Sequence, residues 1–228
     1  HGCFEKADVT AFMHGLIRCY PHDVVLIGIG CMTNIAALFR AYPDAPGLLR
    51  GLHVMNGYFG EKPLPEPWYN WNAWADPIAS AEVFAARIPS HRVIPLNVTN
   101  TLSIDAHMLL HEAICEYHLN VTNTLSIDAH RASVLLRADT PLMRAVFDFG
   151  SVWLKNSGKL TLHDPLAAVS VFHPDICLWR RGMVQVETED EATMAATAFA
   201  PDAQGWIEVA YQADIERFYS IFSDTINR

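Results

Sequence analysis

Short, strongly apolar runs alternate with amphipathic stretches along most of the chain. VVLIGIG at 24–30 is continuously apolar, which is typical of a strand buried on both faces of a parallel sheet. GLHVMNG at 51–57 indicates a second short strand that ends in a glycine turn. We expect a third strand at 93–98, within RVIPLNV, and two late strands at 184–187 and 207–210.

Segments with helical periodicity separate these strands. Two of them open with Asp-Pro, in which Asp is a good N-cap and Pro suits the first helical turn. The predicted helices cover 7–20, 33–42, 77–87 and 131–155, and two more begin at Asp164–Pro165 and Asp214. This alternation predicts an α/β fold with a mainly parallel open sheet flanked by helices, a Rossmann-like core. We find no linker, so residues 1–228 are expected to form one domain.

Composition narrows the class of partner. The chain has 228 residues, a net charge of -9 and no cluster of Lys and Arg, which excludes nucleic acid as the main partner. Its apolar runs are far shorter than the ~20 residues of a membrane helix, so no membrane span is expected. The five cysteines are odd in number and lack C-x-x-C spacing, which favours a reduced cytoplasmic setting.

One segment is duplicated. LNVTNTLSIDAH occurs at 96–107 and again, unchanged, at 119–130. A solenoid needs three or more units, so two perfect copies indicate a recent tandem duplication or an artefact of the gene sequence. Only one copy can occupy the native position. We expect the first copy to do so, with residues 108–118 forming an extra helix or loop.

Three short motifs carry candidate chemistry, and each also has a plain structural interpretation. In His163-Asp164-Pro165, Asp164 is either an N-cap or a metal-binding carboxylate beside a proton donor. In GCMTNIA at 30–36, Thr33 is suited to capping a helix. The Trp-rich loop at 60–74 is either core or an aromatic wall for a flat ligand.

The order of these pieces resembles the inosine-uridine nucleoside hydrolase family. The resemblance runs through nearly the whole chain, in the segments VLIGIGCMTNIAALFRAYP, HVMNGYFG, YNWNAWADPIASAEVF, RVIPLNVT, LHDPLAAV and IEVAYQADIERFYSIF. It implies hydrolysis of the N-glycosidic bond of ribonucleosides, with a calcium ion that holds the attacking water and the ribose hydroxyls. It also implies a homodimer or tetramer, so a homo-oligomer is the expected assembly.

The resemblance assigns roles to particular residues. It implies that Thr33 gives a backbone carbonyl to calcium and that Asp164 is a calcium ligand. His163 would donate a proton to the leaving base, as in the purine-active members. Met55 would line the ribose pocket, and Asn72 would contact the ribose.

The sequence departs from the family pattern at three places. Asn70 replaces a ribose-binding Glu, so we expect it to contact substrate through an amide, and Asn56 replaces a glycine after Met55. The family's first strand and its D-x-D-x-x-x-D-D motif, which supplies most calcium ligands and the general base, are absent from these residues. The acidic stretch at 187–191 is interpreted as a solvated loop.

These departures divide the functional hypotheses. The first is a nucleoside hydrolase lacking its N-terminal segment, an expectation that His1 in place of Met supports. Such a chain should bind no calcium tightly, show no activity alone and expose a sheet edge or an apolar face. The second is a non-catalytic homologue that binds nucleosides or only oligomerises. The third is an unrelated α/β metal hydrolase.

Overall fold

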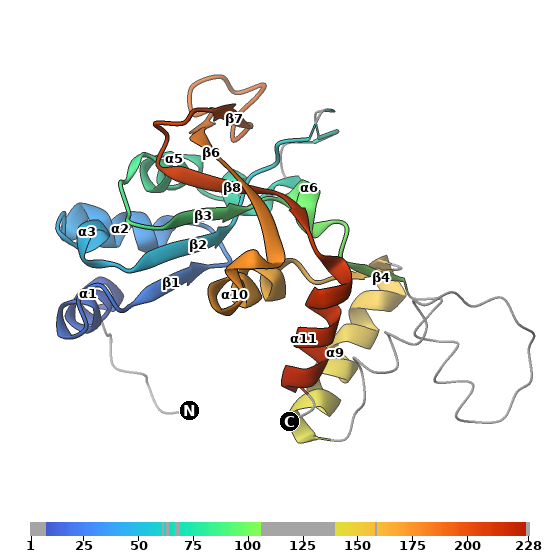
Figure 1. Cartoon of the computed structure of the whole chain (residues 1–228). Coiled ribbons are helices and arrows are strands. Elements are labelled where there is room, and N and C mark those ends of the chain that lie inside the picture. The colour runs from blue at the N-terminus through green and yellow to red at the C-terminus, as the bar shows by residue number, and fades with distance from the viewer. Residues whose placement is uncertain are drawn as a thin grey trace, which may run out of the picture.

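A six-stranded sheet forms the centre of the molecule (Figure 1), with strand order β1-β2-β3-β8-β6-β7. The computed structural model describes residues 8–60, 62, 64–66, 69–105, 140–157 and 159–226. β1, β2, β3 and β8 are parallel neighbours, whereas β6 and β7 run antiparallel at the far edge. The expected α/β fold with a mainly parallel sheet is therefore confirmed.

The elements follow one another along the chain as strands and helices. The strands are β1 Val25–Gly28, β2 Gly51–Met55, β3 His91–Ile94, β4 Ser103–Asp105, β5 Lys159–Thr161, β6 Cys177–Val186, β7 Thr197–Pro201 and β8 Ile207–Ala213. The α-helices are α1 Val9–Cys19, α2 Thr33–Ala41, α3 Ala45–Leu48, α4 Trp71–Trp74, α5 Pro77–Ala85, α6 Leu96–Thr99, α9 Pro141–Ser157, α10 His163–Phe172 and α11 Ile215–Ile226. β4 and β5 form a separate antiparallel pair.

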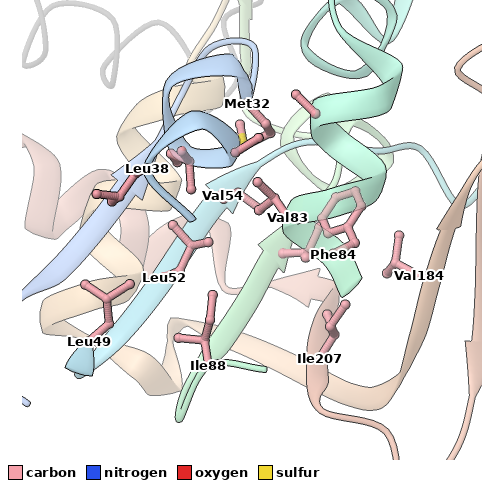
Figure 2. Close-up of a cluster of buried hydrophobic side chains, with 14 of the residues drawn as sticks. Met32, Leu38, Leu49, Leu52, Val54, Val83, Phe84, Ile88, Val184 and Ile207 are labelled. Atoms are coloured by element: carbon pink, nitrogen blue, oxygen red, sulfur yellow. The ribbon is translucent and has the colours of Figure 1, made fainter. Parts of the chain in front are cut away.

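β2 is buried on both faces, whereas the run at 24–30, which was predicted to be buried in this way, forms the edge strand β1 and leaves Ile27 exposed. In β2, Leu52 and Val54 pack with α2 and α5 side chains such as Leu38 and Val83 (Figure 2). Met55 instead joins a second cluster with residues of α10 and α11 on the opposite face. Successive strand residues point to opposite faces, so the sheet separates two apolar cores.

The third strand is shorter than predicted. β3 ends at Ile94, and residues 96–99 form the short helix α6 instead of the expected strand continuing to Val98. Pro95 explains this correction, because it has no N–H for the strand ladder. Its carbonyl accepts hydrogen bonds from the N–H groups of Val98 and Thr99, which starts the helix.

The predicted N-cap Asp76 is confirmed, and Asp214, predicted to start a helix, also caps one, whereas the capping interpretation fails for Asp164 and Thr33. Asp76 accepts a hydrogen bond from the N–H of Ala79, and Asp214 accepts one from the N–H of Arg217. By contrast, α10 begins at His163, and Leu162 rather than Asp164 occupies its N-cap position. Likewise Met32, not Thr33, precedes α2. Asp164 and Thr33 are therefore not used as helix caps.

Other predictions fall partly or wholly outside the described residues. The helix expected at 131–155 is observed as α9 from Pro141, and residues 106–139 are not described. The second copy of the repeat and residues 108–118 lie in that range, so their predictions stay untested. Of the first copy, residues 96–105 are described, and they form α6 and β4 after the third strand.

The late part of the sheet is larger than the sequence suggested. β6 spans ten residues rather than the expected 184–187, and β7 was not predicted. Arg180 and Arg181 interrupt the apolar pattern of β6, because much of this strand lies near the sheet's outer edge. The acidic residues 187–191 form a loop between β6 and β7, as expected.

The opposite edge of the sheet exposes apolar side chains. β1 pairs with β2 on one side and is the edge strand of the described sheet (Figure 1). Ile27 and Ile29 are 40% and 49% exposed there, and the nearby α1 exposes Val9, Phe12, Leu16 and Tyr20. Among the described residues β1 is therefore an edge strand with exposed apolar neighbours, and its link to a missing first strand stays a prediction. Within the described residues, none of the helices is long and apolar enough to cross a bilayer.

A buried polar contact attaches α10 to the centre of the sheet. His53 on β2 lies with its Nδ1 2.8 Å from the hydroxyl oxygen of Ser170 on α10. Ser170 also donates to the carbonyl of Ala167 within the same helix. Both His53 and Ser170 are buried. This contact fixes the position of α10, whose first turn carries His163 and Asp164.

Acid should destabilise the fold through two buried histidines. Burial lowers the pKa of both His53 and His91 from 6.5 to about 4. Below pH 6.5 the unfolded chain therefore binds protons that the folded chain does not, so stability falls as pH drops toward 4. We expect each group to contribute about 3 kcal/mol to this loss.

His91→Leu tests this expectation. The variant should show a shallower fall in the free energy of unfolding between pH 7 and about 4, measured by denaturant titration. Its stability at neutral pH is a separate quantity and does not affect the slope. An unchanged slope in His91→Leu would contradict the prediction.

Candidate active site

A pocket of about 280 Å³ lies beyond the carboxyl ends of β1, β2 and β3. This is where parallel α/β sheets bind ligands. Five of the six residues singled out in the sequence line it, namely Met55, Asn70, Asn72, His163 and Asp164. They come from the end of β2, the loop and short helix before α5, and the first turn of α10, so the fold brings together segments more than 100 residues apart.

Asn72 joins the ends of two neighbouring strands. Its Nδ2 donates to the carbonyl oxygen of Met55 at 2.8 Å and to that of Ile29 at 3.4 Å. Met55 ends β2, and Ile29 directly follows β1. The amide of Asn72 therefore holds one wall of the pocket together through backbone atoms.

The side chain of Asn70 is hydrogen-bonded to the backbone of the turn after β2. Its Oδ1 accepts a hydrogen bond from the N–H of Gly57 at 3.2 Å, and the residue is buried. Gly57 has φ of +84°, a conformation that a residue with a Cβ rarely adopts. The carbonyl of Gly57 accepts from the N–H of Leu96, which also lines the pocket. The turn thus connects β2 to α6.

Thr33 does not line the pocket. Its hydroxyl donates to a carboxylate oxygen of Asp76 at 2.6 Å and so links the first turn of α2 to the cap of α5. This hydrogen bond is the main reason that the pKa of Asp76 is lowered, with the N–H of Ala79 also contributing. The side chain of Thr33 therefore has a structural partner, and its predicted role through the backbone carbonyl remains untested.

The imidazole of His163 contacts a side chain of α6. Its Nδ1 lies 2.7 Å from the hydroxyl oxygen of Thr99, a residue with no exposed surface. The same hydroxyl lies 3.3 Å from the carbonyl oxygen of Leu96, to which it donates. The imidazole thus occupies the pocket wall with one ring nitrogen engaged by α6.

Asp164 lies beside His163 at the half-buried start of α10. Burial raises the pKa of its carboxyl above the usual range, because the charged form loses water. No cation among the described residues is near enough to offset this effect. Asp164 is therefore a carboxylate whose charge the described part of the pocket does not compensate.

Aromatic side chains stand at the pocket mouth. Tyr69 and Trp71 line the pocket and are 47% and 60% exposed, so the loop forms an open aromatic surface rather than core. Trp74 lies next to Trp71, with ring centroids 5.3 Å apart. Of the two interpretations of the Trp-rich loop, the aromatic wall agrees with this exposure.

Several lining residues were not identified from the sequence. Leu96 and Thr161 line the pocket, and Thr99 supports it from behind. Leu96 and Thr99 lie within the matching segment RVIPLNVT, but their pattern shows no chemistry. Only the spatial approach of α6 to α10 reveals their contact with the site.

The described residues do not fit a calcium ion. Calcium takes 6–8 oxygen ligands, usually including several carboxylates. Among the residues that the structure describes, no group of three or more His, Cys, Asp or Glu side chains is arranged to hold a metal. Asp164 is the only carboxylate lining the pocket within that part of the chain.

The sequence of the chain is similar to those of known proteins. The sequence profile described as "Inosine-uridine preferring nucleoside hydrolase" matches residues 4–220. The chain is 23% identical over 190 residues to Uridine nucleosidase 1 of Arabidopsis thaliana, covering 81% of the chain and 50% of that relative. It is 28% identical over 220 residues to the non-specific ribonucleoside hydrolase RihC of Escherichia coli, covering 94% and 64%.

Solved structures show the same fold. The chain matches a purine-preferring ribonucleoside hydrolase from Gardnerella vaginalis with a TM-score of 0.74 at 20% identity, covering 99% of this chain and 67% of that one. It matches a plant nucleoside hydrolase, PpNRh1, with a TM-score of 0.73 at 18% identity, covering 98% and 68%. The chain thus spans half to about two thirds of the length of the relatives that it matches.

Removing the amide of Asn72 should loosen the pocket wall. In Asn72→Ala the carbonyls of Met55 and Ile29 lose a donor, so we expect the free energy of unfolding to fall by about 1–3 kcal/mol. Asn156→Ala is the matched control, because Asn156 is exposed on α9 and its amide donates to one carbonyl of its own helix. The control should stay within about 0.5 kcal/mol of the parent. Equal losses in chemical denaturation would argue against the bridging role.

Proposed function

The chain belongs to the inosine-uridine preferring nucleoside hydrolase family, and we propose that it forms the ribose wall and the proton-donor side of a ribonucleoside hydrolase site. The reaction is hydrolysis of the N-glycosidic bond to give ribose and a free base. Alone, the chain does not catalyse it. The observation that carries this proposal is the single pocket that gathers Met55, Asn70, Asn72, His163 and Asp164.

The chemistry of the bond explains why such residues belong together. Cleavage builds positive charge on the ribose ring and negative charge on the departing base. An acid beside the base assists its departure by giving it a proton, and His163 is the residue in the pocket suited to that role. Its Nδ1 faces Thr99, so the transferred proton would leave from Nε2.

The opposite wall suits the ribose. Met55 presents an apolar side chain, and Asn72 presents an amide held rigidly by two backbone carbonyls. Asn70 departs from the family pattern, and its Oδ1 already accepts from Gly57, so its amide nitrogen is the atom left to meet substrate. We propose Asn70 and Asn72 as ribose contacts and Met55 as the packing surface.

The aromatic mouth suits the base. Tyr69 and Trp71 lie at the pocket opening with much of their surface exposed. A planar base would gain stacking and burial against such rings. This arrangement supports a ribonucleoside as the ligand and gives no reason to expect nucleic acid, in line with the net charge of -9.

The proposed inactivity follows from the small number of metal ligands in the site. The family's calcium would supply an activated water and hold the ribose hydroxyls, but the described residues offer Asp164 and the expected carbonyl of Thr33 as its ligands. Two oxygens are far fewer than calcium requires. We therefore propose that the metal ligands and the general base must come from elsewhere, and we assign no catalytic step to a metal on this chain.

A second candidate function is a non-catalytic homologue that binds nucleosides or serves as an oligomerising subunit. The engagement of Asn70 with Gly57 favours it, because an amide there cannot replace the charge of a carboxylate. The exposed apolar surface of α1 and β1 suits assembly into a homo-oligomer. Either candidate fits a reduced cytoplasmic setting, given the odd number of cysteines.

Calcium binding provides a direct test of the site's completeness. We expect isothermal titration of the full chain with calcium to show no binding in the micromolar range, because two oxygen ligands cannot replace the ion's hydration shell. Asp164→Asn serves as the control and should leave the titration unchanged. Micromolar binding that Asp164→Asn abolishes would show that the chain holds a working metal site.

Ribose release tests the proposed activity. The chain alone should release no ribose from inosine or uridine, whereas a version joined to the part of a longer relative that it does not match should release ribose. In that active version, His163→Ala should lower the rate on inosine by about 10²–10⁴, the usual contribution of a general acid.

The outcomes separate the two candidates. Activity of the chain alone would contradict the proposal. An extended version that binds nucleosides saturably but releases no ribose would favour the non-catalytic homologue.

A further inference from the structure

Helix α9, which lies away from the central sheet (Figure 1), carries an apolar stripe on its surface. The stripe consists of Leu142, Val146, Phe149 and Trp153, which are between 43% and 79% exposed. At about 100° of rotation per residue, these positions fall within about 60° of one another around the helix. Met143, about a quarter of a turn away from them, is buried. The stripe is therefore an apolar face separate from the side on which α9 packs.

The spacing of the stripe indicates what kind of surface would cover it. Its residues follow one another in steps of four, three and four positions. Such steps place side chains along one narrow seam, which is the pattern by which two α-helices pack together. Contiguous large apolar side chains on a surface usually mark a contact site. The expected cover is thus a second helix with apolar residues in the same steps.

The path of the chain brings a candidate to this stripe. β4 ends at Asp105, which pairs with Lys159 at the start of β5, and β5 follows soon after the end of α9. Residue 105 therefore lies near the C-terminal end of α9. The chain must return to Pro141 at the N-terminal end, about 26 Å away along a helix of 17 residues. Residues 106–139, which fall outside the described ranges, connect these two ends.

We propose that residues 110–121 form a helix that packs antiparallel on the stripe of α9. The apolar residues of this segment repeat the steps of four, three and four positions, namely Leu110, Ile114, Tyr117 and Val121. The two seams have equal lengths of about 17 Å. Since the segment runs from the C-terminal to the N-terminal end of α9, its residues meet those of the stripe in reverse order. The resulting pairs are Leu110 with Trp153, Ile114 with Phe149, Tyr117 with Val146, and Val121 with Leu142.

The polar residues of the segment agree with this orientation. Glu112 and Glu116 are one helical turn apart and lie on the side of the predicted helix opposite its apolar seam. Their carboxylates would face water when the seam packs on α9. The pattern therefore favours a helix with one face to bury, and it decides between the helix and the loop that the sequence left open for residues 108–118.

A second segment within 106–139 matches less well. Leu125, Ala129, Ala132 and Leu136 follow the same steps. Two of these residues are alanines, which would bury less apolar surface against the middle of the stripe. In addition, only four residues separate Asp105 from Leu110, so the first segment reaches the C-terminal end of α9 without a long connection. Residues 110–121 are therefore the better occupant.

The proposal gives the surplus residues of the duplication a role. Residues 110–118 lie between the two copies of the repeat, and Val121 belongs to the second copy, 119–130. Its counterpart in the first copy, Val98, lies in α6 and is buried in the core beneath α10. The same local sequence would thus serve in two places. The first copy stays beside the pocket, and the second completes a helix that covers α9.

Cross-linking tests the proposed register. The five native cysteines of the full chain are replaced by serine or alanine, and Ile114→Cys is combined with Phe149→Cys. A bifunctional maleimide that spans about 8–10 Å, the usual distance between packed helices, should join the two cysteines within one chain. Ile114→Cys with Leu142→Cys is the matched control, because its second cysteine is displaced by about 10 Å along α9. This control pair should not be joined.

Hydrogen exchange on the chain with its native cysteines provides an independent measurement. Amides of residues 110–121 should exchange at least about tenfold more slowly than in Ile114→Asp, which places a charge on the seam. The amides of residues 142–153 should also lose protection in that variant. Cys115→Asp places the same charge one residue away and off the seam, so it should leave the exchange of both segments unchanged.

Each alternative occupant has its own outcome, and each would overturn the proposal. Joining of Ala129→Cys with Phe149→Cys, but not of Ile114→Cys with Phe149→Cys, would show that the segment nearer α9 covers the stripe. A cross-linked dimer in place of a cross-linked monomer would show that a second copy of the chain covers it. Rapid exchange of residues 110–121 in the parent chain, or equal effects of Ile114→Asp and Cys115→Asp, would exclude a helix packed through this seam.

Discussion

The burial of β2 on both faces is the constraint on which the rest of the molecule depends. All five residues of the strand are buried, and its neighbours β1 and β3 pair with it in parallel register. Leu52 and Val54 hold α2 and α5 on one face, while Met55 joins the core beneath α10 on the other. The pocket lies where this strand ends at Met55 and the chain turns at Gly57, beside the loops that follow β1 and β3.

Much of the fold was predictable because apolar periodicity dominates in this chain. The runs at 24–30 and 51–57 became β1 and β2, Asp76 caps its helix as expected, and a helix follows Asp214 as expected. Prediction failed where a local chemical rule overrode the pattern. Pro95 ended β3 early, and the two arginines of β6 concealed a long strand whose one side faces solvent.

From the sequence, some residues of the site could be identified, but their contacts could not. Motif order named five of the residues that line the pocket but missed Leu96 and Thr161, and spacing alone could not show which polar groups are already engaged. Thr33 is tied to Asp76, Asn70 is tied to Gly57, and Asp164 is free of any capping role. Thr99 carried no signal at all, since its importance arises from a contact across 64 positions of sequence. Chemistry that depends on long-range contacts becomes visible only in three dimensions.

The amide of Asn72 has a consequence for how the pocket selects ligands. Because Nδ2 bridges carbonyls that end neighbouring strands, its position is governed by the spacing of the sheet, which is about 4.8 Å and cannot adapt. The position of the Asn72 amide is therefore as rigid as the backbone that holds it. This amide cannot adjust by side-chain rotation without losing both hydrogen bonds, whereas the exposed rings of Tyr69 and Trp71 are free to change orientation. The pocket thus combines a polar group whose position follows the backbone with aromatic side chains that can move.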